Sequence, residues 1–219
     1  MSKKLIVFDC DGVLTSVESS WGLLHRYFGS RDNKYFAELY RRGLISYLDW
    51  MIIDIALMIQ SHGAPIKRID VEEALRQVEI RKEAYTTTAE LKRRGHKLAV
   101  VSSGVDILVR RVCRELNIDT CLFNELIFAD DELVPGGIPR VPLLEKPSVI
   151  WRLADELGFK IEDVVYVGDS SWDVNVFKAV PISIALTPCG EACKHAKYTV
   201  NSLVEIVDLL DNLSNNSPS

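Results

Sequence analysis

Short apolar runs recur along the chain, and longer segments with a helical pattern lie between them. The runs do not alternate strictly between apolar and polar positions; they are Leu5–Phe8, Leu98–Val101, Val164–Val167 and Ile182–Leu186. Such strands are typical of a sheet buried on both faces. The intervening helical patterns are Asp106–Leu116, Ser148–Leu157 and Trp172–Ala179. This alternation predicts an α/β fold with a doubly wound parallel sheet.

The segment from Thr15 to about Arg81 breaks this rhythm. It holds no convincing strand, has loops at Gly29 and at 63–65, and shows helical patterns at Trp21–Phe28, Asn33–Arg42, Tyr47–Gln60 and Val71–Lys82. We therefore expect residues 1–14 and 82–211 to form the α/β core domain and residues 15–81 to form an inserted helical cap domain.

Two smaller features complete the organisation. Leu126–Phe128 and Glu132–Val134 flank Ala129–Asp131 and predict a small hairpin, followed by a loop through Gly136 and Gly137. Residues 212–219 are rich in Ser and Asn, so we expect a flexible C-terminal tail.

Composition limits the function classes. The net charge is −5 and the sequence has no block of Lys or Arg, so it does not predict a surface that binds nucleic acid. The apolar segment Ile45–Gln60 contains two aspartates and is too short to span a bilayer, so we expect no membrane association. Five scattered cysteines favour a reducing, cytoplasmic location, and we interpret Cys189 and Cys193 as structural thiols. The oligomeric state is left open.

Acidic and hydroxyl side chains follow the predicted strands. Asp9 and Asp11 come after the first run, Ser102, Ser103 and Gly104 after the second, and Asp169 after the third; Lys146 opens the helix before that third run. In open parallel sheets the ligand site lies beyond the carboxyl ends of the strands, so these groups are expected to meet at one edge.

The expected cluster suits phosphoryl transfer. A carboxylate can attack phosphorus and divide hydrolysis into two easier steps. Neighbouring carboxylates would repel one another and the substrate without a divalent cation, and oxygen ligands with little His or Cys point to Mg²⁺. A Lys and a Ser hydroxyl would then neutralise and hydrogen-bond the transferring oxygens.

The motifs resemble those of the haloacid dehalogenase superfamily, in particular its phosphoserine-phosphatase-like branch. They are the sequence Phe8-Asp9-Cys10-Asp11-Gly12-Val13, Ser102 after an apolar strand, Lys146, and the sequence Gly168-Asp169-Ser170-Ser171-Trp172-Asp173. The likeness runs from about Lys4 to Leu210. It implies a Mg²⁺-dependent phosphatase that acts on a small phosphate ester.

The resemblance also implies a role for each matching residue. Asp9 would be the nucleophile, and Asp11 would be the acid/base, with its backbone carbonyl on the metal. Asp9 and Asp169 would bind Mg²⁺ directly. Asp173 would orient the Asp169 ligand or a metal-bound water without binding the metal itself. The implied phosphate ligands are Ser102 and Lys146, helped by the amides of Ser103 and Gly104 at a helix N-terminus.

The cap departs from the family pattern. The phosphoserine-type family holds the substrate carboxylate with an arginine, and Asp54 stands at the matching position. Trp172 replaces an asparagine that often precedes the last aspartate, and Glu18 matches a substrate-contacting glutamate. We expect Glu18, Tyr47, Asp54 and Trp172 to influence substrate selectivity, and we expect phosphoserine not to be preferred.

Two alternatives to a phosphatase stay open. A phosphotransferase or phosphomutase on the same scaffold would keep every catalytic residue and exclude water through cap closure. A phospho-signalling receiver module also clusters aspartates, a hydroxyl and a lysine around Mg²⁺, but the inserted segment after the first strand disfavours it.

Overall fold

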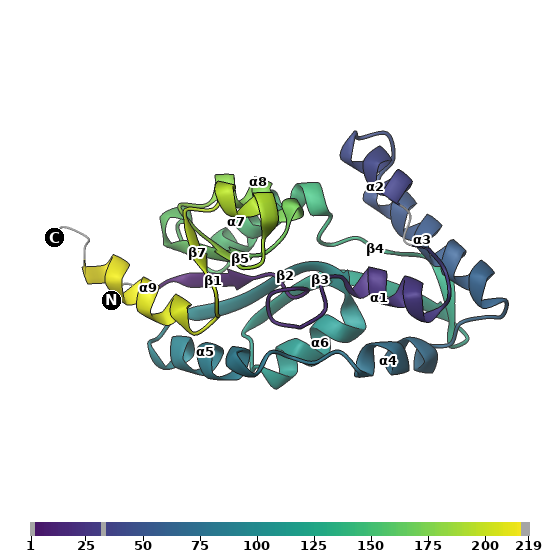
Figure 1. Ribbon diagram of the computed structural model, residues 1–219, viewed down its shortest axis with the longest axis horizontal. Coiled ribbons are helices and arrows are strands. Elements are labelled where there is room, and N and C mark those ends of the chain that lie inside the picture. The colour runs from purple at the N-terminus through teal and green to yellow at the C-terminus, as the bar shows by residue number, and fades with distance from the viewer. Residues whose placement is uncertain (1–2, 32–33, 216–219) are drawn as a thin grey trace.

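The computed structural model describes residues 3–31 and 34–215, and a sheet crosses its centre (Figure 1). In the described part the sheet has seven strands in the order β4-β3-β2-β1-β5-β6-β7. The strands are β1 Leu5–Phe8, β2 Lys97–Val105, β3 Thr120–Ala129, β4 Glu132–Ile138, β5 Val164–Gly168, β6 Ile182–Leu186 and β7 Tyr198–Val200. β4 runs antiparallel to β3, and the other neighbouring pairs are parallel.

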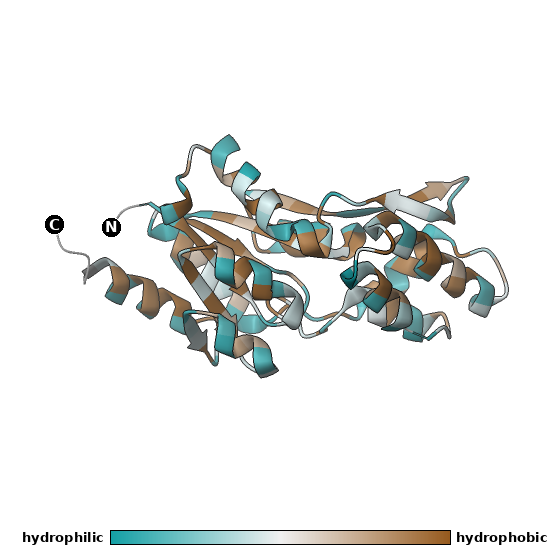
Figure 2. Cartoon of the chain, turned by 90° about the horizontal axis from the view of Figure 1, so that it is seen from above, coloured by the Kyte–Doolittle hydropathy of each residue, from teal (hydrophilic) through white to brown (hydrophobic). Residues whose placement is uncertain are grey.

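Helices cover both faces of the sheet (Figure 1). One face carries α7 (Lys146–Glu156) and α8 (Val174–Ala179), and the other carries α5 (Lys82–Arg93), α6 (Asp106–Glu115) and α9 (Glu205–Asn215). Along β1, Leu5 and Val7 pack into the first layer and Ile6 and Phe8 into the second. Figure 2 shows hydrophobic residues concentrated in the central strands. The doubly wound parallel fold is therefore confirmed, and it explains why β1 has no polar positions.

Four helices occupy the predicted cap segment in the described residues. They are α1 Ser20–Tyr27, α2 Lys34–Arg41, α3 Tyr47–His62 and α4 Arg68–Arg76. The start of the second predicted helix, Asn33, lies outside the described residues. The predicted Val71–Lys82 helix is wrong at its end, because the chain leaves α4 at Arg76 and starts α5 at Lys82 after a bridge between Thr15 and Ile80.

The predicted hairpin exists and is longer than expected. Asp130 and Asp131 form its turn with positive φ angles of 49° and 67°, which aspartate tolerates better than most residues. The expected loop at Gly136 and Gly137 is wrong, since both residues lie in β4. A Cβ on Gly137 would lie 2.2 Å from Met51 Cε, so this glycine lets β4 approach α3 closely.

The C-terminal expectation also changes. Residues 212–215, predicted to be part of a flexible tail, belong to α9, and residues 216–219 lie outside the described part. Ile206 and Leu210, on the apolar side of this helix, pack into the core. This packing stabilises the helix although the composition of its last residues is polar. In the described residues, no helix combines the length and apolar character needed to cross a bilayer.

The cysteines pair in a way that the sequence did not predict. Disulfides join Cys113 to Cys121 and Cys189 to Cys193, and Cys10 is a buried free thiol. The interpretation of Cys189 and Cys193 as thiols is therefore wrong, because a short 3-10 helix (Gly190–His195) brings their Cα atoms to 5.3 Å. The cysteines thus give no support to the expected cytoplasmic location.

Candidate active site

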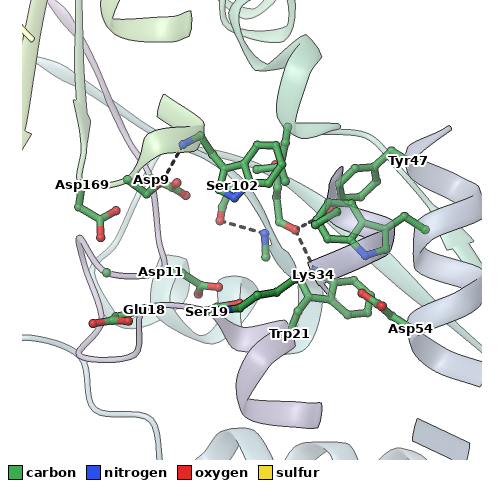
Figure 3. A pocket seen from close by; sticks show the side chains of 18 of the residues that line it. Asp9, Asp11, Glu18, Ser19, Trp21, Lys34, Tyr47, Asp54, Ser102 and Asp169 are labelled. Atoms are coloured by element: carbon green, nitrogen blue, oxygen red, sulfur yellow. Dashed lines mark hydrogen bonds between the residues drawn. The ribbon is translucent and has the colours of Figure 1, made fainter. Parts of the chain in front are cut away.

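A cavity of about 710 Å³ lies beyond the carboxyl ends of the central strands. Asp9 and Asp11 reach it from the end of β1, Ser102 from β2, and Asp169 from the end of β5. Figure 3 shows these four residues on one side and Tyr47 and Asp54 on the other. The strands β2, β1 and β5 are neighbours in the sheet, which brings together residues that are far apart in sequence.

Lys146 lies beneath Asp9, where its side chain is inaccessible to solvent. Its Nζ donates hydrogen bonds to Asp9 Oδ2 at 2.7 Å, Asp173 Oδ1 at 3.0 Å and the hydroxyl of Tyr166 at 3.1 Å. Burial alone would lower the pKa of Lys146, but the charges of Asp173 and Asp9 raise it above its ordinary value. Lys146 is therefore a fixed cation at the base of the site.

Both carboxylate oxygens of Asp173 are engaged. Oδ1 accepts hydrogen bonds from Lys146 and from the Tyr166 hydroxyl, and Oδ2 accepts from the amide and hydroxyl of Ser170 and the amide of Asp169. Burial would raise the pKa of Asp173, but Lys146 and the Tyr166 hydrogen bond lower it below its ordinary value. Asp173 is thus an ionised anchor for the turn that carries Asp169.

Asp9 and Asp169 present carboxylates to the cavity. Asp9 Oδ1 accepts a hydrogen bond of 2.7 Å from the Cys10 amide, which fixes the orientation of the side chain. Burial raises the pKa of Asp9, with Lys146 opposing that effect. Burial, together with the charges of Asp9 and Asp173, raises the pKa of Asp169 to about 8. Ionising both carboxylates would therefore place more negative charge on the pocket wall than Lys146 balances.

This surplus of negative charge fits a divalent cation. Carboxylate oxygens of Asp9, Asp169 and Asp173 lie within 4.8 Å of one another. Since the oxygens of Asp173 already accept several hydrogen bonds, Asp9 and Asp169 are better placed as direct ligands. Carboxylate oxygens without nitrogen or sulfur donors suit a hard ion such as Mg²⁺.

Asp11 is held by the first turn of α1. Its Oδ2 accepts hydrogen bonds of 2.6 Å from both the amide and the hydroxyl of Ser20. Its Oδ1 is buried and accepts no hydrogen bond from the described residues. Burial raises the pKa of Asp11 to about 6, although the Ser20 hydrogen bonds act in the opposite direction. A carboxyl group with this pKa can exchange a proton near neutral pH.

The turn after β1 is tight at Gly12. Gly12 has a φ of +73°, and a Cβ at this position would lie 2.0 Å from Asp169 Oδ2. Arg81, at the start of α5, donates hydrogen bonds to the carbonyls of Gly12 and Thr15. The glycine thus lets the first and last motifs approach each other, and the arginine holds the loop.

The Ser102–Gly104 segment differs from the expectation. It lies inside β2, where the register with β3 shifts between Val101 and Val105, and α6 begins at Asp106. The amides of Ser103 and Gly104 are therefore not at a helix N-terminus; the Gly104 amide donates to Ser102 Oγ at 3.1 Å. The Ser103 hydroxyl donates to the carbonyl of Val141 at 2.7 Å, so it is used in the fold. Ser102, which lines the cavity, is the better placed hydroxyl.

The selectivity residues also lie around the cavity. Glu18, Tyr47, Asp54 and Trp172 all line it, with Glu18 exposed and Asp54 only 5% exposed. The hydroxyl of Tyr47 donates to the carbonyl of Ser103 at 3.1 Å, which ties α3 to β2. The Trp172 ring lies 6.0 Å from that of Trp50, so α3 and the last motif share an aromatic cluster.

Sequence reasoning missed several supporting residues. Ser20, Arg81 and Tyr166 contact the site directly, and Trp21 donates its indole N–H to the Ser103 carbonyl at 3.1 Å. Tyr166 could have been suspected, because a hydroxyl inside an apolar central strand needs a buried partner. Ser20 and Arg81 carry no comparable signal, since serines and arginines near helix starts are common.

Several known proteins are similar to this chain in sequence. Residues 3–180 match the model of a family described as haloacid dehalogenase-like hydrolase. A phosphoserine phosphatase of Methanocaldococcus jannaschii is 30% identical over 185 residues, which cover 84% of this chain and 85% of that protein. A phosphoserine phosphatase of Idiomarina loihiensis is 30% identical over 216 residues, covering 95% and 94%.

Solved structures agree with the sequence relatives. A substrate-bound phosphoserine phosphatase complex superposes with a TM-score of 0.80 at 26% identity, covering 95% of this chain and 99% of that one. A structure described as a phospho-aspartyl intermediate analogue of phosphoserine phosphatase gives the same TM-score, identity and coverage. The fold is thus shared along nearly the whole chain.

Proposed function

We propose that this chain, which belongs to the haloacid dehalogenase-like hydrolases and is a phosphoric monoester hydrolase, uses Asp9 and Mg²⁺ to dephosphorylate a small monoester. The observation that carries the proposal is the environment of Asp9. Its carboxylate lines the cavity, is oriented by the Cys10 amide, and lies 2.7 Å from the buried ammonium of Lys146. A fixed carboxylate beside a fixed cation suits attack on a phosphoryl group.

In the first step, an Asp9 oxygen forms a bond to phosphorus while the bond from phosphorus to the ester oxygen breaks. Protonated Asp11 gives its proton to the leaving oxygen, and its raised pKa makes this form available near neutral pH. The product of this step is an aspartyl-phosphate on Asp9 and a free alcohol.

In the second step, a water molecule attacks the same phosphorus atom and Asp11 takes its proton. The bond between phosphorus and the Asp9 oxygen breaks, which releases inorganic phosphate and restores the carboxylate. Lys146 and the Ser102 hydroxyl would bind the phosphoryl oxygens in both steps, because Lys146 donates a hydrogen bond to Asp9 and Ser102 lines the same cavity as Asp9.

Mg²⁺ would be held by the carboxylates of Asp9 and Asp169 and by the backbone carbonyl of Asp11. When bound, the ion supplies positive charge to oxygens on which negative charge develops. Asp173 would keep the Asp169 turn in place through its bonds to the amides of Asp169 and Ser170.

The domain division and the location are also proposals. We propose that residues 15–81 act as a cap over a core formed by 1–14 and 82–211, and that the β3–β4 hairpin works with the cap because β4 packs on α3. A cytoplasmic location stays a prediction. The proposed partner is a small-molecule phosphate ester.

A rapid acid quench with ³²P-labelled aryl phosphate tests the function. We expect the label to appear on Asp9 in the unmodified protein and to be absent from Asp9→Asn, which should also lose turnover. Asp155→Asn, an exposed change on α7, is the control and should keep both the label and turnover. Turnover in Asp9→Asn within tenfold of the unmodified protein would refute the covalent mechanism. Transfer of phosphate to an added alcohol in preference to water would identify a phosphotransferase.

A further inference from the structure

Aromatic side chains from three separate segments line the cavity. They come from α1, α3 and the last motif, and they are Trp21, Tyr47, Trp50 and Trp172. Figure 3 shows Trp21 and Tyr47 at the end of the cavity away from Asp169. The attacking and leaving oxygens of a phosphoryl transfer lie roughly in line. An ester attacked by Asp9 would therefore extend its leaving group away from Asp9, towards these rings.

Trp21 and Tyr47 are fixed by their polar atoms. The indole N–H of Trp21 and the hydroxyl of Tyr47 each donate a hydrogen bond of 3.1 Å to the carbonyl of Ser103. The side-chain amide of the buried Asn124 donates to the same carbonyl at 3.0 Å, which holds the acceptor in place. Since Ser103 follows Ser102 directly, both rings are anchored one residue from the proposed phosphate ligand. With their polar atoms engaged, they offer the cavity mainly ring surface.

Trp50 and Trp172 are supported by a third aromatic residue. The buried Tyr40 packs against both, with its ring centroid 5.5 Å from that of Trp50 and 6.3 Å from that of Trp172. The Tyr40 hydroxyl accepts a hydrogen bond of 3.0 Å from the amide of Leu144, which fixes the support. Trp50 and Trp172 line the cavity and are only partly buried, so ring surface of both is available to a ligand.

The position for a cation over Trp172 is already occupied by the protein. The guanidinium of Arg41 lies 4.2 Å from the centroid of the Trp172 ring, where the ring face attracts positive charge. A cationic leaving group at this ring would meet Arg41 as a like charge. An uncharged aromatic ring can pack with an offset, or edge to face, without displacing the guanidinium.

The other charged groups around the cap side of the cavity do not favour one sign of charge. In the described part of the chain, the exposed charged residues that line the cavity are two acids and two bases, Glu18, Glu38, Lys34 and Arg41. The buried carboxylate of Asp54 has a partner within the protein, since His25 Nε2 lies 3.5 Å from its Oδ1. The aromatic surface is therefore the feature that distinguishes this side.

We propose that the leaving group of the substrate carries an uncharged aromatic ring, which binds against Trp50 and Trp172. The inference rests on the proposed phosphatase function and specifies its substrate class as arylalkyl or aryl phosphates. A cavity of about 710 Å³ is in the size range of sites that enclose a whole small-molecule ligand, so a ring fits beside the phosphoryl group. Hydrolysis would release the aromatic alcohol and inorganic phosphate.

Three phosphate esters test the ring directly. Benzyl phosphate carries it, cyclohexylmethyl phosphate is its saturated counterpart of similar size, and propyl phosphate has no ring. Their leaving alcohols are of similar acidity, so differences in kcat/KM report recognition rather than the ease of bond breaking. We expect kcat/KM for benzyl phosphate to exceed that for each of the other two by about tenfold. If either saturated ester, or phosphocholine as a cationic ester, is turned over as efficiently as benzyl phosphate, the proposal is overturned.

Variants assign the preference to particular rings. Trp50→Leu and Trp172→Leu should each bring the values for benzyl and cyclohexylmethyl phosphate to within about threefold, and Trp172→Phe should keep part of the preference. Trp151→Leu, which removes a half-exposed tryptophan from α7, is the matched control and should keep all of it. General damage to the site would lower turnover of every ester and leave the ratio near tenfold. That result in both leucine variants would refute the assignment.

A binding measurement separates this inference from the proposed function. In Asp9→Asn with Mg²⁺ present, calorimetry should show tighter binding of benzyl phosphate than of cyclohexylmethyl phosphate, whether or not the unmodified protein turns them over. Selective binding without hydrolysis of any ester would refute the phosphatase proposal and keep the ring site. Hydrolysis of these esters without preference for the ring in binding or turnover would do the reverse. If the leucine variants do not fold, the calorimetric comparison decides alone.

Discussion

The ammonium of Lys146 and the carboxylate of Asp173 lie 3.0 Å apart, and neither side chain is exposed to solvent. Asp9 shares the same ammonium at 2.7 Å, so one buried cation serves two carboxylates. Breaking a buried ion pair from one side leaves an uncompensated charge, which costs more than the pair contributes when intact. The pair therefore couples the stability of the fold to the charge of the site.

Lys146→Met should lower the free energy of unfolding by about 3 kcal/mol or more, because Asp9 and Asp173 would lose their counterion. Urea unfolding measures this change. The deficit should shrink as the pH is lowered, since protonation removes the unpaired charges, and it should shrink when Asp173→Asn is added. Lys178→Met, an exposed change in α8, is the control. Equal destabilisation by the two methionine variants would contradict the role of Lys146 as counterion.

Asp169 should make the metal-free protein less stable as the pH rises. Its pKa in the folded protein is raised to about 8, whereas the pKa of an aspartate in the unfolded chain is about 3.9. Between these values the folded protein keeps a proton that the unfolded chain has released, so the free energy of unfolding falls with increasing pH. Asp169→Asn should reduce that slope and stabilise the metal-free protein at pH 8 by at least about 1 kcal/mol.

Mg²⁺ provides the second half of this test. It should stabilise the unmodified protein at pH 8 but not Asp169→Asn, and chelator should abolish turnover, which Mg²⁺ then restores. Asp155→Asn should behave as the unmodified protein in each measurement. A metal-free stability curve that Asp169→Asn leaves unchanged between pH 5 and pH 8 would mean that Asp169 does not carry the raised pKa.

Asp11→Asn should harm poor leaving groups more than good ones. An alkoxide needs a proton in the transition state and a nitrophenolate does not, so the first step should fall by about a hundredfold or more for alkyl phosphates and far less for nitrophenyl phosphate. Breakdown of the phospho-enzyme should slow for both. Single-turnover quench experiments measure the two steps separately, and equal losses in the first step would remove Asp11 from the acid role.

The pH dependence of the first step follows from the same residue. With a pKa of about 6, Asp11 loses its acid form as the pH rises above 6, so phosphorylation by alkyl esters should decline on that side. Dephosphorylation needs the base form and should rise over the same range. Asp11→Asn should flatten both trends.

The core and its motifs could be predicted because their signals are local. The β1 run has no polar position, and Asp9 and Asp11 follow it directly. The features that could not be predicted depend on packing between segments that are far apart in the sequence. β7 is a three-residue strand recognisable only beside β6, and Gly137 reads as a loop residue until α3 is placed against it. The hydrogen bonds of Ser20 to Asp11 likewise depend on the start of α1 lying at the sheet edge.

The final prediction concerns Gly12. An alanine there would meet two separate penalties: a φ of +73°, which L-residues rarely adopt, and a Cβ 2.0 Å from Asp169 Oδ2. Gly158, after α7, is the matched control, because it has the same φ of 73° but no atom within 4 Å of its added Cβ.

Gly158→Ala should therefore carry the backbone cost alone, about 1–2 kcal/mol of stability, and keep the affinity for Mg²⁺ and turnover. Gly12→Ala should carry that cost and also displace the Asp169 carboxylate from Asp9, which weakens Mg²⁺ binding by about tenfold or more. Calorimetric titration with Mg²⁺ and urea unfolding of both variants measure the two effects independently. Equal Mg²⁺ affinity in the two variants would show that the close approach of Gly12 to Asp169 is not needed for the metal site, and that Gly12 is present only for its backbone conformation.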